Sequence, residues 1–152
     1  MKKIATNKKV YHDYHILETF EAGLLLKGVE VKSIRGGKIG FKDSYCDVNN
    51  AEMFLVGFYV APYKQASYNN VDSVRKRKLL LHKNQIIKIQ NKIKEKGLTC
   101  VPTKIYFNNK NLVKVEIGLA KGKANYDKRD SIKKKDLKRE NQQLTKVRNI
   151  KY

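Results

Sequence analysis

The sequence predicts a mainly β protein in which about six short antiparallel strands close into a small barrel. Two observations support this fold class. Short segments rich in β-branched and aromatic residues recur along the chain, separated by glycine, asparagine and proline. Only one segment, by contrast, has strong helical periodicity. The OB-fold is a known barrel of this kind, and it commonly binds oligonucleotides, so we predict an OB-fold-like architecture.

The composition indicates one basic domain with a tail. A chain of 152 residues fits a single domain that folds without a disulfide or a metal. The net charge is +20, from 34 Lys and Arg against 14 Asp and Glu, and such a surface attracts polyanions. Nucleic acid is the first candidate partner and an anionic membrane surface the second. We predict a folded body over residues 1–123 and a basic tail over residues 124–152.

The sequence also bears on the compartment. No apolar run approaches the roughly 20 residues that span a bilayer, and the first residues lack the apolar region of a signal peptide. We therefore expect a cytoplasmic protein without a membrane partner, and we take it to be a monomer. Cys46 and Cys100 have no second sulfur or histidine at a ligand spacing, so we expect two buried, reduced thiols.

The N-terminal part contains one clear strand and one ambiguous segment. Residues 1–10 are basic and polar, which predicts a mobile terminus. Residues 11–20 predict a strand that continues through residues 23–26 after a bend. In residues 28–35, the alternation of Val29 and Val31 fits a strand, whereas Val29 and Ile34 only loosely share a helix face. The residues alone leave this segment open.

A hairpin and a long loop are predicted next. Residues 44–48 form a short strand, and Asn49-Asn50 reads as its hairpin turn. Residues 53–60 are nearly all apolar, which predicts a strand covered on both faces. Residues 62–74 read as a loop, and a loop of that length in a compact domain is often functional.

The strongest helix prediction covers residues 81–96. Ile86, Ile89 and Ile93 form one apolar stripe, and Gly97 provides the C-terminal stop. Lys88 and Lys92 are like charges at i,i+4, which disfavours the helix slightly and suggests that this face serves a partner.

The last two strands of the body are predicted at residues 99–107 and 112–120, joined by a turn at residues 108–111. Beyond them the chain is basic and poor in apolar residues, so we predict a tail that is disordered when free. Leu137, Leu144 and Val147 would share one face if the tail became helical on a partner.

The segment from Arg75 to Lys83 places four cations directly before three leucines. We interpret it as a core anchor that presents Arg75, Lys76, Arg77 and Lys78 to a polyanion, although a solvated helix entry would have the same composition. Basic and aromatic residues also alternate at Lys8-Lys9-Val10-Tyr11, at Tyr63-Lys64 and at residues 126–129. Cations neutralise phosphates and aromatic rings stack on unpaired bases, so this pattern favours nucleic-acid binding.

Catalytic signals are weak. His12 and His15 fall on opposite faces of the predicted strand, and the glycines at residues 36–40 lack the spacing of a phosphate-binding loop. Asp43 and Asp47 are better explained as turn and surface residues than as metal ligands. We therefore predict no enzyme activity, no metal and no cofactor, with an RNA-processing enzyme as the alternative from another class.

Several stretches, in this order, resemble those of one known family. They are Asn7-Lys8-Lys9, Leu17 to Gly23, Gly28 to Arg35, Asp43-Ser44-Tyr45, Ala61-Pro62-Tyr63, Arg75 to Lys83, Gly122-Lys123 and Asp127-Lys128-Arg129. On these residues the chain resembles the SmpB family of bacterial trans-translation, and the resemblance spans nearly the whole chain.

The resemblance implies an OB-like barrel with two or three added helices, one of them at residues 28–35. It implies that the protein binds the tRNA-like domain of transfer-messenger RNA and delivers it to stalled ribosomes, where the nascent peptide is tagged. A general ribosomal or structured-RNA-binding protein is the alternative. Together with the basic runs, the resemblance gives these RNA-binding candidates: Asn7, Lys8, Glu30, Lys32, Arg35, Arg75, Lys76, Arg77, Lys78, Lys121 and Lys123.

The family's tail becomes helical in the messenger channel, so the resemblance implies contacts with ribosomal RNA there and in the decoding centre. The candidates are Tyr126, Asp127, Lys128, Arg129, Lys133, Lys134, Lys138, Arg148 and Ile150. Tyr126 has an alternative role in packing against the barrel. Ala124 replaces an expected lysine, and Val29 replaces a threonine of the family pattern. Glu30 either recognises RNA or forms an ordinary surface ion pair.

Overall fold

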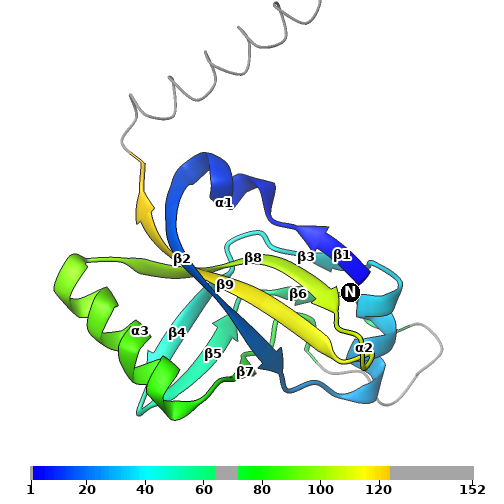
Figure 1. Cartoon of the computed structure of the whole chain (residues 1–152). Coiled ribbons are helices and arrows are strands. Elements are labelled where there is room, and N and C mark those ends of the chain that lie inside the picture. The colour runs from blue at the N-terminus through cyan, green and yellow to red at the C-terminus, as the bar shows by residue number, and fades with distance from the viewer. Residues whose placement is uncertain (1, 64–71, 124–152) are drawn as a thin grey trace, which may run out of the picture.

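The computed structural model describes residues 2–63 and 72–123, in which six antiparallel strands close into a ring (Figure 1). Neighbouring strands follow the order β8-β4-β5-β7-β2-β9, and the ring closes because β8 also pairs with β9. This confirms the mainly β class and the number of strands. The ring strands are β2 (Tyr14–Leu24), β4 (Tyr45–Asn49), β5 (Glu52–Val56), β7 (Arg77–Leu80), β8 (Thr99–Phe107) and β9 (Val113–Gly122).

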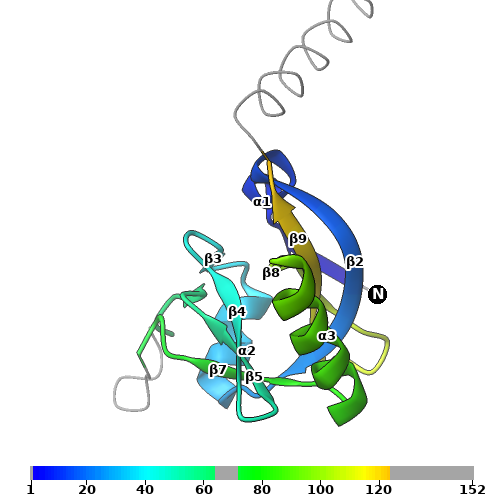
Figure 2. The same cartoon turned by 90° about the vertical axis from the view of Figure 1, so that its left-hand side faces the viewer.

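The other described elements surround the ring. Strand β1 (Lys2–Thr6) pairs with residues 104–107 of β8, while β3 (Ile39–Gly40) and β6 (Tyr59–Val60) form a separate two-stranded sheet. The helices are α1 (Lys8–Asp13), α2 (Gly28–Arg35) and α3 (Lys83–Lys96). Helices α2 and α3 lie on opposite sides of the ring, as the two views at right angles show (Figure 1, Figure 2). None of these helices has the length and apolar character required to cross a bilayer.

Apolar residues that alternate with polar ones along the strands form the core inside the ring. Along β9, Val113, Val115, Ile117 and Leu119 are buried, and the polar residues between them are more exposed. Helix α3 buries Ile86 and Ile89 against the same core. Its C-cap, Gly97, has φ +61°, a conformation that glycine adopts without strain, as the predicted helix stop requires.

The predicted helix at residues 28–35 is confirmed as α2, and the turn at residues 108–111 joins β8 to β9 as expected. The hairpin between β4 and β5 is also confirmed, with Asn50 and Ala51 at positive φ in its turn. Helix α3 begins at Lys83, two residues later than predicted, with His82 as its N-cap, and the strand at Arg77–Leu80 before it was not predicted.

The prediction of a mobile N-terminus was wrong. Residues 2–6 pair with β8, and residues 8–13 form α1, so the strand predicted from residue 11 begins at Tyr14. The Asn7 side chain donates a hydrogen bond to the Pro102 carbonyl at 3.0 Å, and the Asn7 backbone N–H donates to the Thr103 carbonyl at 2.7 Å. Val10 packs against Val101 and Ala120. Contacts with β8 therefore order a segment whose own composition is polar.

The predicted strand at residues 53–60 is divided at Gly57. Its φ is +78°, and a Cβ at this position would lie 2.6 Å from the Asp43 carbonyl oxygen, so only glycine fits without a shift of the backbone. The chain leaves β5 there, buries Phe58 and starts β6 at Tyr59. In β2 the pairing irregularity lies between Ile16 and Glu18, rather than at the predicted bend near residue 22.

Cys46 and Cys100 are buried free thiols, as predicted, but they are not isolated from each other. They are the register pair through which β4 meets β8. Burial is the main cause that raises the pKa of the Cys46 thiol, and a hydrogen bond with Cys100 raises it further. The two thiols therefore lie together where β4 pairs with β8.

Candidate nucleic-acid interface

A buried ion cluster holds α2 on the ring. Glu30, in the first turn of α2, is 2% exposed, and Arg77, on β7, is completely buried. The Arg77 Nε donates to Glu30 Oε2 at 2.6 Å, and the Arg75 Nε donates to both Glu30 oxygens at 3.1 and 3.2 Å. The Lys27 backbone N–H donates to Glu30 Oε1 at 2.9 Å, which fixes the start of the helix.

Arg77 uses its remaining donors within the protein. Its Nη1 donates to the carbonyl oxygens of Phe58 at 2.6 Å and Arg75 at 3.3 Å, and its Nη2 donates to that of Ser73 at 3.1 Å. The guanidinium also lies 5.8 Å from the centroid of the Phe58 ring. A side chain without exposed surface does not reach a phosphate, so the prediction that Arg77 contacts RNA directly does not fit this arrangement.

Glu30 is also withdrawn from the surface. Both sequence interpretations, RNA recognition and a surface ion pair, placed its carboxylate in solvent, where it is not. Burial alone would raise the pKa of Glu30, but hydrogen bonds from Arg75, from the Lys27 backbone N–H and from Arg77 outweigh it and lower the pKa. The carboxylate stays ionised and compensates the buried charge of Arg77.

Arg75 links this buried cluster to the surface. Its side chain is 27% exposed, and its Nη2 donates to Glu30 and to the Leu25 carbonyl oxygen at 3.3 Å. The guanidinium is thereby held in one orientation at the edge of α2. A cation fixed in this way loses less conformational entropy on binding a phosphate than a free side chain does.

Helix α2 presents two further cations. Lys32 and Arg35 are exposed in its last turn, and each lies beside an aromatic ring. The Lys32 Nζ is 5.2 Å from the Tyr63 ring centroid, and the Arg35 guanidinium carbon is 5.7 Å from that of Phe107. Cation–π contacts at these distances hold both cations beside their rings, and both residues remain exposed. Lys32, Arg35 and Arg75 are hereafter called the α2 surface.

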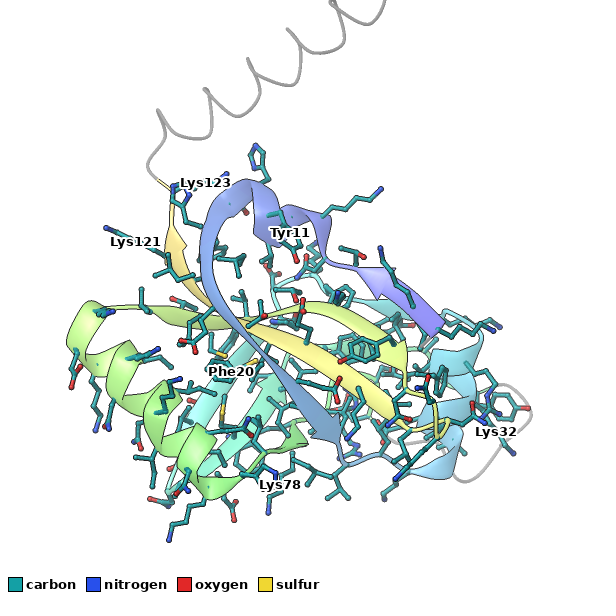
Figure 3. All side chains as sticks on the ribbon, viewed as in Figure 1. Tyr11, Phe20, Lys32, Lys78, Lys121 and Lys123 are labelled. Atoms are coloured by element: carbon teal, nitrogen blue, oxygen red, sulfur yellow. The ribbon has the colours of Figure 1, made fainter. Side chains whose placement is uncertain are left out.

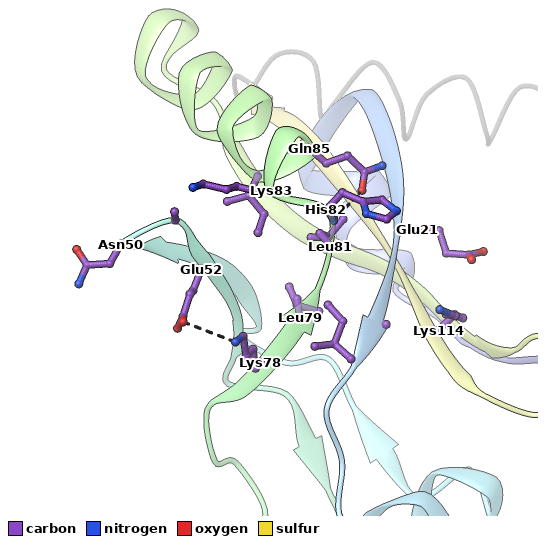
Figure 4. A pocket seen from close by; sticks show the side chains of 14 residues that line it. Glu21, Asn50, Glu52, Lys78, Leu79, Leu81, His82, Lys83, Gln85 and Lys114 are labelled. Atoms are coloured by element: carbon purple, nitrogen blue, oxygen red, sulfur yellow. Dashed lines mark hydrogen bonds and ion pairs between the residues drawn. The ribbon is translucent and has the colours of Figure 1, made fainter.

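Lys76 and Lys78 lie on a different face, the outer side of β5 and β7. Lys76 Nζ is 3.6 Å from an Asp47 oxygen and 4.5 Å from the Phe54 ring centroid. Lys78 Nζ is 3.6 Å from a Glu52 oxygen, as the dashed line in Figure 4 shows. Each lysine has a carboxylate beside it, so this face offers less net positive charge to RNA than the sequence suggested.

The cavity in Figure 4, of about 770 Å³, is likewise lined by both positively and negatively charged residues.

The remaining candidates gather near the end of β9. Lys8 is exposed on α1, Lys121 is exposed on β9, and Lys123 Nζ donates to the Tyr11 carbonyl oxygen at 3.2 Å. Figure 3 shows Lys121 and Lys123 at the end of β9, far from Lys32. Asn7, directly before α1, is 7% exposed, and its side-chain amide donates to the Pro102 carbonyl oxygen on β8. The predicted RNA contacts thus divide between the α2 surface and an α1–β9 corner, defined here as Lys8, Lys121 and Lys123.

The sequence interpretation of a partner-binding face rested on the repulsion between Lys88 and Lys92, and that repulsion is offset within the protein. Both lysines donate to the Glu18 carboxylate on β2, Lys88 at 3.1 Å. These hydrogen bonds lower the pKa of Glu18, and the one from Lys92 has the larger effect. A carboxylate 70 residues away in sequence therefore offsets their repulsion. The periodicity of the helix alone could not reveal this ion pair with a residue on β2.

The described residues hold no group of three or more His, Cys, Asp or Glu side chains placed to bind a metal. The nine tail candidates, from Tyr126 to Ile150, lie outside the described residues, and so does most of the loop at residues 62–74.

The closed ring and its basic α2 surface define a class, the small β-ring proteins whose surface is suited to an RNA backbone. Comparisons with known proteins identify the family. The family model described as SmpB protein matches residues 4–147, and the chain belongs to this family.

Relatives and one solved structure agree. A protein of Persephonella marina named SsrA-binding protein is 56% identical over 140 residues, which is 92% of this chain and 91% of that protein. One of Thermosipho melanesiensis with the same name is 56% identical over 139 residues, or 91% and 95% of the two chains. A solved structure described as "tmRNA-SmpB: a journey to the center of the bacterial ribosome" matches with a TM-score of 0.68 and 48% identity, covering 84% of this chain and 93% of that chain.

Proposed function

We propose that this protein binds the tRNA-like domain of transfer-messenger RNA and delivers it to stalled ribosomes for trans-translation. The names of its relatives and the subject of the similar solved structure support this proposal. The proposal concerns binding and delivery, without catalysis, metal or cofactor.

The observation that carries the proposal is the α2 surface. Lys32, Arg35 and Arg75 project from one helix and the adjoining end of β7, and Glu30 holds that helix in place from below. Phosphate contacts supply much of the affinity for RNA, and fixed cations also set its register and orientation. We propose that the tRNA-like domain lies across α2, where Glu30 and Arg77 act as positioning residues.

The α1–β9 corner supplies a second contact region. It lies where the body gives way to the basic tail, which starts at residue 124. We propose that Lys8, Lys121 and Lys123 continue the RNA contacts toward the tail, and that the tail residues contact ribosomal RNA. The family match through residue 147 supports a role for the tail within the same function.

A native gel tests the RNA preference. The full chain is mixed with a tRNA-like-domain RNA and, separately, with a plain duplex of equal length, at physiological salt because non-specific binding weakens there. We expect clear preference for the tRNA-like RNA and no cleavage. Equal affinity would favour a general structured-RNA-binding protein, and cleavage products would favour the enzyme alternative.

A truncation separates binding from delivery. Deletion of residues 131–152 leaves Lys32, Arg35 and Arg75 in place, so RNA affinity should stay within a few fold near physiological salt. Peptide tagging on stalled ribosomes in a reconstituted translation system should be lost. Full tagging by the truncated protein would contradict the role proposed for the tail.

A further inference from the structure

A cavity lies directly beside the α2 surface, at the end of the ring where the β8–β9 turn meets the start of β1. Its volume is about 410 Å³, within the range of roughly 300–1,000 Å³ that is typical of small-ligand sites. Two cations, one aromatic ring and three amides line it, without any acidic residue: Lys2, Arg35, Phe107, Asn108, Asn109 and Asn111. The sequence marked this turn only as a connection between strands.

Arg35 forms one wall of the cavity. Its guanidinium carbon lies 5.7 Å from the centroid of Phe107, which is itself only 6% exposed. The ring therefore supports the guanidinium from the protein side, while Arg35 itself is exposed. A guanidinium held in this way offers its other face for stacking, and unpaired RNA bases stack on arginine planes as they do on aromatic rings.

The turn between β8 and β9 supplies the amides that line the cavity beside Arg35. Asn108 Oδ1 accepts hydrogen bonds from the backbone N–H groups of Lys110 and Leu112, both at 2.9 Å, which fixes the turn. Asn109 is exposed, and Asn111 has φ +59°, a conformation that asparagine tolerates. Carboxamides both donate and accept hydrogen bonds, as the edge of a base does.

Lys2 supplies a second charge at the mouth. It lies on β1 in register with Phe107, the residue beneath Arg35. A base stacked on Arg35, with its edge toward the amides, would leave its phosphate outside the cavity, where a lysine can neutralise it. Stacking, edge recognition and charge neutralisation thus come from three elements that meet at this cavity.

We propose that this cavity takes one unpaired nucleotide of the bound RNA, with its base stacked on Arg35 and its edge read by Asn109 and Asn111. Adenine is the preferred base because carboxamides pair with it through two hydrogen bonds. The inference rests on the proposed RNA binding and extends it from phosphate contact to recognition of a base.

Short oligonucleotides test the cavity apart from the whole RNA. Binding of labelled hexa-adenylate and hexacytidylate to the full chain is followed by fluorescence anisotropy. Arg35→Lys keeps the charge but removes the stacking plane. Asn109→Ala removes one amide, and Asn111→Gly removes the other while it preserves the positive φ. Lys110→Ala is the control, because it removes a cation from the same turn but not from the cavity wall.

We expect preference for hexa-adenylate, and a loss of affinity of at least about fivefold in Arg35→Lys, in line with the worth of one stacked base. The double amide variant should lose the preference for adenine, and Lys110→Ala should keep it. The inference would be overturned by equal binding of both oligonucleotides by the parent, by parent-like affinity of Arg35→Lys for hexa-adenylate, or by parent-like adenine preference in the double amide variant. Melting temperatures close to that of the parent verify that the variants are folded.

Different results contradict the proposed function and the cavity assignment. If the full chain shows no preference for the tRNA-like RNA over a duplex, the proposed function fails, whatever the oligonucleotides do. If that preference is present but the cavity variants bind hexa-adenylate as the parent does, only the cavity assignment fails.

Discussion

At the scale of single residues, the carboxylate of Glu30 determines how the α2 surface is built. It sits between Arg75 and Arg77, which follow it by 45 and 47 positions in the chain. No local pattern shows that pairing, so the sequence could place Glu30 among the functional residues but could not show that it is buried. In the structure, Glu30 is a buried support for the residues around it, and the RNA contacts are proposed for those neighbours instead.

The first prediction concerns stability. Glu30→Ala leaves the charge of Arg77 buried without its partner, and loss of one member of a buried pair costs about 3–5 kcal/mol. Denaturant unfolding should show a loss of that order in the free energy of unfolding. Glu52→Ala is the matched control, because its exposed pair with Lys78 should contribute at most about 1 kcal/mol. Equal, small losses in both variants would refute the buried role of Glu30.

The second prediction concerns acid. The pKa of Glu30 is lower in the folded protein than in the unfolded chain, so its stabilising contribution is present above the ordinary carboxyl pKa of about 4.3. That contribution is lost as the pH falls from about 4.3 through the lowered pKa. The difference in unfolding free energy between the parent and Glu30→Gln should therefore narrow below about pH 4. A difference that stays constant from pH 7 to pH 3 would contradict it.

At the scale of elements, short-range sequence patterns predicted the elements that depend on neighbouring residues. They missed the elements that depend on contacts with distant strands. The alternation in β9, the isoleucine stripe of α3 and the turn at residues 108–111 each depend on neighbours in sequence, and each was predicted. Strand β1 and helix α1 depend on the free edge of β8, and the break at Gly57 depends on the Asp43 carbonyl. Those partners are unknown until the ring has closed.

The third prediction concerns the seam between β4 and β8. Directly opposed residues of antiparallel strands have Cα atoms about 4.5–5.5 Å apart, within the range of about 4.4–6.8 Å that a disulfide spans. Treatment with diamide, a thiol oxidant, should therefore join Cys46 to Cys100 within one chain, with the loss of two hydrogen atoms, and should raise the melting temperature.

The raised pKa of Cys46 keeps its thiol protonated near neutral pH, so the reaction should be slow in the folded protein and faster at alkaline pH. Mass spectrometry of tryptic peptides under non-reducing conditions identifies the link, and Cys46→Ser should abolish it. Disulfides between chains, without the link within one chain, would show that the two thiols do not face each other.

At the scale of the whole molecule, the positive charges are not equally available to a polyanion. Lys88 and Lys92 are engaged by Glu18, and Lys76 and Lys78 lie beside carboxylates on the outer strand face. Lys32 and Arg35 of the α2 surface are exposed, and α3 lies on the opposite side of the ring (Figure 1, Figure 2). Net charge therefore predicted the kind of partner, whereas the proposal that the RNA binds on the α2 side depends on the fold.

The dependence of RNA affinity on salt tests this account most directly. Affinity for the tRNA-like RNA is measured over a series of salt concentrations for the parent, for Lys32→Ala/Arg35→Ala and for Lys94→Ala/Lys96→Ala, which removes the same charge from the exposed end of α3. Each lost phosphate contact reduces the steepness of the log–log plot by about 0.7–0.9. The α2 variant should therefore flatten the plot by about 1.4–1.8, and the α3 variant should leave it nearly unchanged. Equal slopes for the two variants would contradict the assignment of the RNA to the α2 surface.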